Sequence, residues 1–228
     1  MSSDHPIILA GDPHGEHQAI IDACLERKPG TLIVLGDFGL KEPLKIAYAA
    51  VLDAGWTLRY IHGNHDTDSE SLYDNLIGDA PEWNIHGKCI DAGGLLIGGL
   101  GGVFKGRIWE PREGREEPGW PTQAAFAKAH RARWRQGLPL GQRDTIWPDD
   151  VAKLSKLRLN VLVTHEAPLP HKYGYGGLNV LAEACRARLL VHGHHHKTYG
   201  TVTAVPGRGV LHIQGVGKAE PWLLEMPE

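Results

Sequence analysis

Aspartate, histidine and asparagine residues, which commonly bind metals, follow five short apolar runs of the sequence. No other feature of the chain constrains its fold as strongly. The runs lie at residues 7–10, 32–35, 58–61, 161–163 and 189–191. Short apolar runs that end in turn residues are typical of strands buried on both faces of a sheet. The polar residues that follow them are Asp12, His14, Asp37, Asn64, His65, Asp66, His165, His194 and His196. Because ligands of α/β proteins bind where the carboxyl ends of the strands converge, we expect these side chains to share one crevice.

Helical patterns lie between the apolar runs, as expected for parallel strands joined by crossover helices. The spacing predicts helices at about 16–28, 43–54, 69–76, 121–135, 149–157 and 178–187. Two short strands are expected within 90–100, and antiparallel edge strands within 201–224. We therefore expect one α/β domain over residues 1–228, with a sheet-rich centre and helices outside. A segment containing Trp and Arg at about 102–148 interrupts the pattern, and we expect it to be an insertion near the site.

Composition excludes several classes of protein. No stretch approaches the roughly 18 apolar residues of a membrane-spanning helix, and the first residues lack the pattern of a signal peptide. The three cysteines are widely spaced, which is typical of small buried side chains in a reducing compartment. We therefore expect a cytoplasmic protein with no membrane partner. The net charge of −3 argues against a general polyanion-binding surface.

Carboxylates, imidazoles and one amide form a ligand set that suits divalent metals. Hydrolysis of a phosphate ester at neutral pH needs a hydroxide, an in-line attack and neutralisation of the developing charge. Two metals about 3.5–4 Å apart supply all three. Such a pair needs a bridging ligand, and Asp37, at the end of a central strand, is the candidate.

The order Asp-x-His, Gly-Asp, Gly-Asn-His-Asp, His and Gly-His-x-His, from residue 7 to about residue 200, resembles the calcineurin-like metallophosphoesterase superfamily. The resemblance implies an αββα four-layer fold, in which helices flank a central β-sandwich, and two divalent metal ions as cofactors. It implies that one metal is held by Asp12, His14 and His196. The second would be held by Asn64, His165 and His194. Manganese is the favoured metal, and iron and zinc are alternatives that such mixed ligands also tolerate.

Two residues beside Asn64 are the candidates for catalysis. Adjacent side chains point apart, so His65 is not expected to bind a metal if Asn64 does. We predict instead that His65 faces the substrate and protonates the leaving oxygen as a general acid. Asp66 is predicted to hold the other nitrogen of that imidazole and to favour its charged form. The resemblance implies the same two roles.

Each of these residues, taken alone, has a simpler interpretation. An aspartate at a strand end often caps the helix that follows, Asn64 suits a turn after a glycine, and His165 could be an ordinary loop histidine. Three histidines and two carboxylates have no structural reason to converge, however, so the whole set favours a metal site. Solvated or supporting roles are expected for His62, His86, His192 and His195. Of these, His192 is also a candidate for substrate binding.

The sequence departs from the family pattern at one position. Many members carry a second aspartate three residues after the strand-end aspartate, and the serine/threonine protein phosphatases continue it with Arg-Gly. Here Leu40 stands at that position and no Arg-Gly pair follows. This argues against a protein phosphatase of that branch and leaves the metal ligands unaffected.

The insertion is the expected source of substrate specificity. Between residues 104 and 136 it carries eight basic residues against four acidic ones, with tryptophans at 109, 120, 134 and 147 in or beside it. Basic groups interleaved with aromatic rings suit a phosphate attached to a stackable base, and Arg107 is the residue expected to reach the site. The alternative is that the tryptophans pack the insertion onto the body, with its charges on a solvated helix face. The loop at 168–177 is a second candidate for the rim.

The first functional hypothesis is a metal-dependent phosphodiesterase or phosphatase that acts on a small or nucleotide-like phosphoester. A nuclease of the same superfamily is a second hypothesis, but it would need a long basic groove, so nucleic acid is not the favoured partner. The third is a non-catalytic scaffold, which should have lost ligands or the acid. The sequence leaves open the substrate, the choice between monoester and diester, and the oligomeric state.

Overall fold

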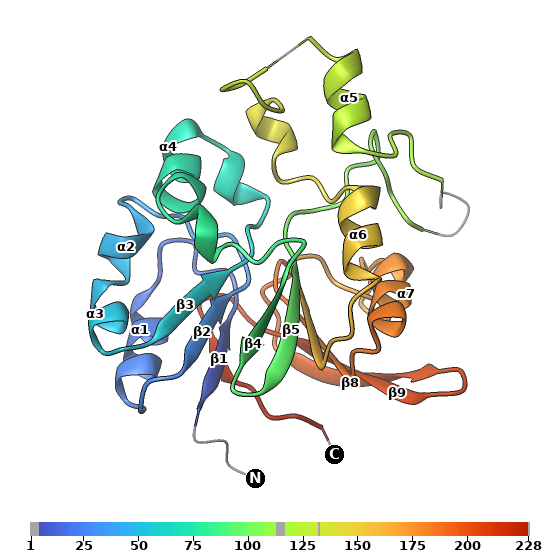
Figure 1. The fold of residues 1–228 in the computed structure, drawn as a ribbon. Coiled ribbons are helices and arrows are strands. Elements are labelled where there is room, and N and C mark those ends of the chain that lie inside the picture. Colours follow the sequence, from blue (N-terminus) through green and yellow to red (C-terminus); the bar gives the residue numbers. More distant parts are fainter. Residues whose placement is uncertain (1–4, 113–116, 132, 228) are drawn as a thin grey trace.

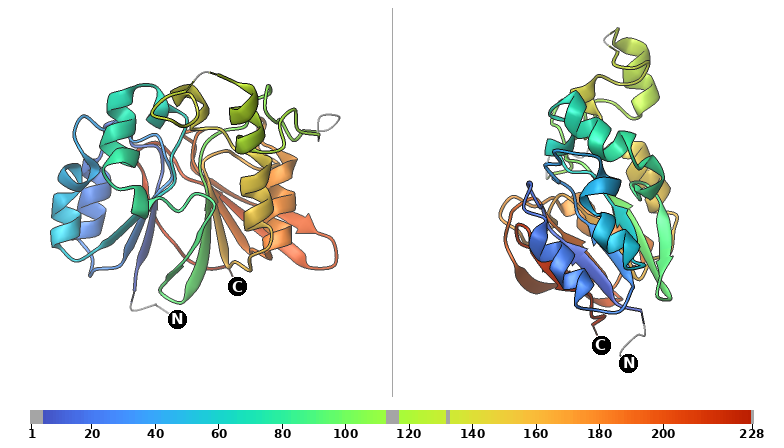
Figure 2. Two further views of the ribbon diagram at one scale, coloured as in Figure 1. Left: turned by 45° about the horizontal axis from the view of Figure 1, so that its top comes forward. Right: turned by 90° about the vertical axis from the view of Figure 1, so that its left-hand side faces the viewer.

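Two β-sheets stack face to face, and helices cover the outer face of each, which gives four layers (Figures 1 and 2). The protein is seen here in a computed structural model that describes residues 5–112, 117–131 and 133–227. The predicted β-sandwich flanked by helices is confirmed. Three charged residues of the predicted insertion lie outside the described residues: Glu113, Arg115 and Glu116.

The ten strands found among the described residues form one sheet of four and one of six. The first sheet has the order β10 (Pro221–Leu223), β1 (Ile7–Ala10), β2 (Thr31–Val34), β3 (Thr57–Tyr60). The second has the order β4 (Cys89–Ala92), β5 (Leu95–Leu100), β6 (Val161–Thr164), β7 (Leu189–His192), β9 (Gly209–Gly215), β8 (Tyr199–Val205). Strands β1 to β3 pair in parallel, as do β5, β6, β7 and β9, while β10, β4 and β8 are antiparallel edges.

Side chains of each strand alternate between two cores, which explains why the runs are apolar throughout. Ile7 and Leu9 of β1 lie in the core between the two sheets. Ile8 and Ala10, which point the other way, lie in the core beneath the outer helices. All four are at most 4% exposed. Burial of each large side chain contributes about 1.5–3 kcal/mol, so both faces of the strand stabilise the sandwich.

The helices are short and cover the two sheets separately. Helices α1 (Gln18–Leu25), α2 (Leu44–Ala47) and α3 (Ala49–Asp53) contribute to the core on the first sheet. Helices α6 (Pro148–Leu154) and α7 (Gly176–Cys185) contribute to the core on the second. Helix α4 (Glu70–Tyr73) continues into a π-helical turn, η2 (Asp74–Gly78), and 3-10 turns lie at η1 (His65–Thr67), η3 (Pro81–Trp83) and η4 (Leu140–Gln142). No helix in the described ranges has the length and apolar character needed to cross a membrane.

The predicted single helix over 43–54 is wrong, because the chain breaks it at Tyr48. This residue has φ −111° and ψ 19°, which separates α2 from α3. Its ring is fully buried, and its hydroxyl lies 2.9 Å from the Nδ1 atom of His17. A tertiary contact to another element therefore overrides the local helical pattern.

Two further expectations are corrected by the structure. The helix predicted over 121–135 is α5 (Gln123–Ala129) alone, because His130 turns to an extended conformation and stacks its ring on Phe126 at 3.8 Å. The C-terminal strands are not all antiparallel edges, since β9 lies inside the second sheet and pairs in parallel with β7. The alternation of apolar and polar residues predicted that strands lie in this region, but it did not predict which strands they pair with.

The predicted insertion leaves the second sheet after β5 and returns to it at α6 (Figure 1). It has a small core of its own, in which Ile108, Phe126 and Trp147 are buried. Trp109 and Trp120 pack against this core. Three of the four tryptophans therefore hold the insertion together, as the packing alternative proposed.

Candidate metal centre

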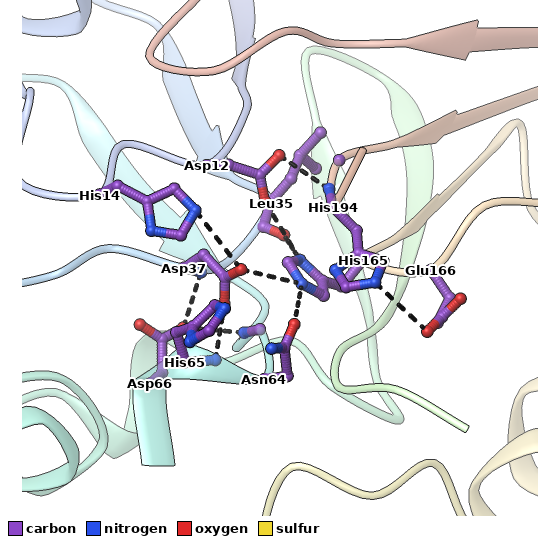
Figure 3. A network of polar contacts seen from close by, with 12 residues as sticks. Asp12, His14, Leu35, Asp37, Asn64, His65, Asp66, His165, Glu166 and His194 are labelled. Carbon is purple, nitrogen blue, oxygen red and sulfur yellow. Dashed lines mark hydrogen bonds and ion pairs between the residues drawn. The ribbon is translucent and has the colours of Figure 1, made fainter. Parts of the chain in front are cut away.

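The residues that follow β1, β2, β3, β6 and β7 meet in one place, although they come from both sheets (Figure 3). The nine polar residues singled out after the apolar runs all lie in or beside this centre. Their convergence follows from the topology, because the carboxyl ends of these strands share one edge of the sandwich.

Left-handed backbone conformations concentrate in the centre. Among the described residues, nine that are not glycine have positive φ, and five of them are predicted metal ligands: Asp12, His14, Asp37, His194 and His196. Such conformations cost energy for residues with a Cβ atom and persist only where the surroundings impose them. The turns that carry these residues bring their side chains close to one another.

The first group of candidate ligands consists of Asp12, His14 and His196, whose ligand atoms lie within 4.8 Å of one another. The Nε2 atoms of the two histidines are 3.0 Å apart. Asp12 accepts the backbone N–H of His194 at Oδ2 (2.8 Å), whereas its buried Oδ1 has no hydrogen-bond partner among the described residues. Burial raises the pKa of Asp12 to about 7. This buried Oδ1 oxygen lies 3.5 Å from Nδ1 of His165. A buried carboxylate oxygen without a hydrogen bond, close to several imidazoles, suits a cation.

The second group consists of Asp37, His165 and His194, with Asn64 beside them. The Nδ1 atom of His165 lies 2.7 Å from the carbonyl oxygen of Leu35, which can only accept a hydrogen bond. A neutral His165 therefore carries its proton on Nδ1 and directs the Nε2 lone pair toward Asn64 Oδ1 (3.1 Å) and Asp37 Oδ2 (3.4 Å). Three acceptors that face one another need a cation between them.

The pKa of His165 also indicates that a positive charge belongs between these acceptors. Burial lowers its pKa, but Asp37 and then Asp12 oppose this effect, and the resulting pKa is about 10. Without a metal, His165 is therefore protonated at Nε2, where the proton lies between the acceptor oxygens. A bound metal would replace this proton.

Asp37 connects the two groups. Its Oδ2 atom lies 3.7 Å from Nε2 of His14 and 3.4 Å from Nε2 of His165, one histidine from each group. Its Oδ1 atom accepts the backbone N–H of His65 at 2.8 Å, which fixes the carboxylate. Burial raises the pKa of Asp37, but His165 outweighs that effect and holds the pKa below its usual range. One ionised oxygen therefore faces both groups, as a bridging ligand would. The donor set fits two divalent ions.

His65 lies beside the two groups and outside them. Its side chain is 52% exposed, and its Nδ1 atom lies 2.7 Å from Oδ2 of Asp68. The hydrogen bond to Asp68 raises the pKa of His65. The imidazole is thus held at Nδ1, and its Nε2 atom has no hydrogen bond to the described residues, so it can meet a ligand. Sequence reasoning missed Asp68, which becomes the neighbour of His65 only because η1 brings residues three apart together.

The prediction that Asp66 orients His65 is wrong. Asp66 is 2% exposed, and its carboxylate accepts three backbone N–H groups, from Asp37 (2.9 Å), Phe38 (2.8 Å) and Gly63 (2.8 Å). It therefore ties the loop after β2 to the loop after β3. Its effect on the metal centre is indirect, because it fixes the loops that carry Asp37 and Asn64.

Asp66→Ala should destabilise the fold by about 3 kcal/mol, because it leaves three buried N–H groups without a partner. Urea unfolding of the metal-free protein, followed by circular dichroism, measures this loss. Asp53→Ala is the control, since Asp53 is exposed at the end of α3 and should change stability by less than about 0.5 kcal/mol. An Asp66→Ala variant as stable as the control would contradict the role given to this carboxylate.

A carboxylate that the sequence pattern did not indicate also faces the centre. Glu166 is 5% exposed, and its Oε1 atom lies 3.8 Å from Nε2 of His194. Glu166, His194 and His195 form a third group of neighbouring ligand atoms. Burial raises the pKa of Glu166 to about 7. Since Glu166 faces Nε2 of His194, the Nδ1 atom of that imidazole remains for a metal in the second group.

The two predicted substrate-binding residues lie differently from expectation. His192 is 1% exposed, and its ring nitrogens meet the carbonyl oxygen of Gly193 (2.9 Å) and the hydroxyl of Tyr199 (2.7 Å). No nitrogen is left for a substrate, so the substrate-binding prediction for His192 is wrong. Arg107 is exposed in the insertion, and the described contacts do not include it among the residues of the centre.

The histidines expected to be solvated or supporting pack against neighbouring side chains. His62 is 5% exposed, and its Nδ1 atom lies 3.3 Å from Nδ2 of Asn84. His86 packs its ring on His62 at 4.8 Å and pairs with Asp150 at 3.2 Å. His195 stacks on His171 at 4.1 Å. These residues are packed among other side chains, and a supporting role for them stays a prediction.

Comparisons with known proteins identify similar sequences and similar folds, and they agree with one another. Residues 5–198 match the family model for calcineurin-like phosphoesterases. The chain is 37% identical over 203 residues to an uncharacterized protein of Haemophilus influenzae, which covers 88% of this chain and 87% of that protein. It is similar to the crystal structure of TT1561 of Thermus thermophilus, with a TM-score of 0.56 and 15% identity over 94% of this chain and 90% of that one. A second solved chain has a TM-score of 0.53 at 11% identity, over 98% and 99% of the two chains. These two structures share the fold.

Proposed function

This chain belongs to the calcineurin-like phosphoesterase family, whose members hydrolyse phosphoesters with divalent metals, and from that premise we propose that it is a binuclear phosphodiesterase or phosphatase. The observation that carries the proposal is the position of Asp37 Oδ2, within 3.7 Å of a histidine from each ligand group. A small or nucleotide-like phosphoester is the proposed substrate.

Seven residues of the chain are proposed to hold the two metals. Asp12, His14 and His196 are proposed to hold one ion, and Asn64, His165 and His194 the other. Asp37 is proposed to bridge them. Two divalent ions supply a nucleophile at neutral pH and neutralise the charge that develops on the phosphate. We propose manganese for both positions, with iron and zinc as alternatives, because all of them accept mixed imidazole and carboxylate ligands.

His65 is proposed to supply the proton that the leaving oxygen needs. Its Nδ1 atom is engaged by Asp68, so Nε2 can present a proton to the substrate. The raised pKa of His65 keeps the imidazole protonated over more of the neutral range. Asp68 is therefore proposed to position the His65 imidazole, the role that the sequence predicted for Asp66.

Asp68→Asn should move the pH dependence of turnover. The general acid works only when protonated, so activity falls as pH rises through the pKa of His65. Removing the carboxylate lowers that pKa, and the descending limb of the kcat profile should therefore move to lower pH. The measurement is kcat against pH with saturating manganese, and Asp53→Asn is the control. A descending limb that stays in place would show that Asp68 does not set this pKa.

Two alternatives follow from the same family membership. A nuclease would need a basic groove along its surface, and its rate would fall steeply with salt. A scaffold would have lost ligands or the acid, whereas the two ligand groups and His65 are present together here. We therefore favour an enzyme with a small phosphorylated partner, and we propose the cytoplasm as its compartment.

Hydrolysis of a chromogenic phosphodiester and its monoester, side by side, tests the proposal on manganese-loaded protein. Turnover of either ester that stops on chelation supports a metallophosphoesterase, and the ratio of the two rates assigns it as a diesterase or a monoesterase. Absence of turnover for both esters, with metal bound, would favour the scaffold.

A further inference from the structure

The insertion contacts both halves of the molecule. It leaves the second sheet after β5, yet Trp134 packs edge-on against Tyr73 of α4, beside the first sheet, with ring centroids 4.8 Å apart. Arg143 donates to the hydroxyl of Tyr73 at 2.8 Å. Arg135 pairs with Asp74, where one N–O distance is 2.9 Å. We call residues 134–143 the strap. Figures 1 and 2 show this part of the insertion next to α4.

A tight backbone turn in the strap places Arg135 near Trp134 and Asp74. Arg135 and Gln136 both have positive φ, which gives a tight turn closed by a hydrogen bond from Gly137 N–H to Trp134 O (3.0 Å). Two successive left-handed residues with a Cβ atom are costly unless the surroundings impose them. Here the turn brings the Arg135 guanidinium within 4.2 Å of the Trp134 ring and toward Asp74.

The root of the insertion lies against the loop that carries Asn64 and His65. The N–H of Gly102 donates to the carbonyl of His62 at 2.7 Å, two residues before Asn64. Lys105 pairs with buried Asp144 at 2.6 Å and also donates to the carbonyl of Gly141 in the strap (2.7 Å). Burial raises the pKa of Asp144, and Asp68, the partner of His65, contributes to the same shift. The insertion therefore stands on the His65 side of the metal centre.

These contacts close a ring of chain beside His65. The ring runs from His65 through α4, across the Tyr73–Trp134 contact into the strap, and back through the root to the loop before Asn64. The leaving group of a substrate that His65 protonates must lie on this side of the phosphate. A small leaving group needs room on this side alone, whereas a polymer needs an open path on both sides of its phosphate.

Four of the basic residues of the insertion bond to other groups of the chain. Arg135 is paired with Asp74, Lys105 with Asp144, and Arg112 with Glu110 at 3.4 Å. Arg133 bonds to backbone carbonyls of its own segment, Ala127 and His130. These four side chains are thus held by contacts within the chain, and they are not available to follow the backbone of a nucleic acid strand.

We propose that the strap selects for phosphoesters with a small leaving group, such as a single nucleotide or a phosphorylated metabolite, and excludes strands of nucleic acid. This inference rests on the proposed function. It assigns specificity to Tyr73, Trp134 and Arg135, none of which is a candidate metal ligand.

The test uses the Trp134→Ala/Arg135→Ala double variant of the full chain. Its substrates are a chromogenic phosphodiester and a single-stranded oligonucleotide, both with manganese. Loss of a stacked cation and a bidentate ion pair should raise the ratio of oligonucleotide to chromogenic cleavage about 10-fold or more. Tyr73→Ala, which breaks the contact from the other side, should raise it in the same direction. Arg131→Ala removes an exposed arginine just before the strap and should leave the ratio unchanged.

Two outcomes would overturn the strap proposal without touching the proposed function. One is an unchanged ratio in both the double variant and Tyr73→Ala. The other is a wild-type protein that cleaves the oligonucleotide as fast as the chromogenic ester. If the wild type hydrolyses neither substrate, the proposed function fails. In that case the affinity for a labelled oligonucleotide, measured by fluorescence anisotropy for the wild type and the double variant, tests whether the strap excludes nucleic acid. Tighter binding by the double variant supports the strap, and equal binding overturns it.

Discussion

His65→Ala should hydrolyse a phosphoester with a poor leaving group about 10²–10⁴ times more slowly than the wild type, the range expected for loss of a general acid. The imidazole lies outside both ligand groups, and its Nδ1 atom is taken by Asp68 at 2.7 Å. Metal content should therefore be unchanged, because no candidate ligand is removed. Steady-state kinetics and metal analysis on the same sample measure both expectations.

The choice of leaving group provides the control for this variant. An alkyl phosphoester needs a proton on the departing oxygen, whereas a nitrophenyl ester departs readily as an anion. His65→Ala should therefore slow the alkyl ester more than the nitrophenyl ester. Equal losses for the two esters would indicate that His65 acts through binding or structure, and unchanged rates would remove it from the mechanism altogether.

Asp37→Asn should have the second large effect, through the metals themselves. The substitution preserves the shape of the side chain but removes the ionised oxygen that faces both ligand groups at 3.4 and 3.7 Å. We expect turnover to fall by about 10³-fold, the scale of a lost electrostatic stabiliser in an active site. Metal content should fall as well, since a neutral amide is a poor bridge between two cations.

Thermal unfolding separates this effect from simple loss of structure. Ligands that bind only the native state raise Tm, so manganese should raise the Tm of the wild type and raise that of Asp37→Asn much less. The metal-free variant should be less stable than the metal-free wild type, because Asp37 is the ionised partner of buried His165 and its own pKa is lowered by that histidine. The comparison therefore uses the rise in Tm that manganese causes in each protein. A variant that binds two metals and keeps full activity would refute the bridging role.

The strands and the ligand positions could be predicted because their signals are local. Each apolar run is buried on both faces, and each candidate ligand follows its strand within a few residues. The positive φ angles of Asp12, His14 and Asp37 could not be predicted, but they do not change which residues converge. Sequence order and the parallel topology were sufficient to bring the two ligand groups together.

The missed features depend on contacts between distant parts of the chain. Asp68 replaced Asp66 as the partner of His65 because a 3-10 turn aligns residues three apart, while loop packing draws Asp66 toward backbone N–H groups of another loop. The contact of Arg135 with Asp74 spans 61 positions. Neither periodicity nor spacing carries information on such pairs.

A metal titration of the metal-free protein tests the central claim most directly. Bound manganese and turnover of a chromogenic phosphodiester are measured on each sample as metal is added. Activity should be absent without metal, should saturate at about two ions per chain, and should disappear again on chelation. Turnover without metal, saturation at a single ion, or two bound ions with no hydrolysis of any phosphoester tried would contradict a binuclear phosphoesterase.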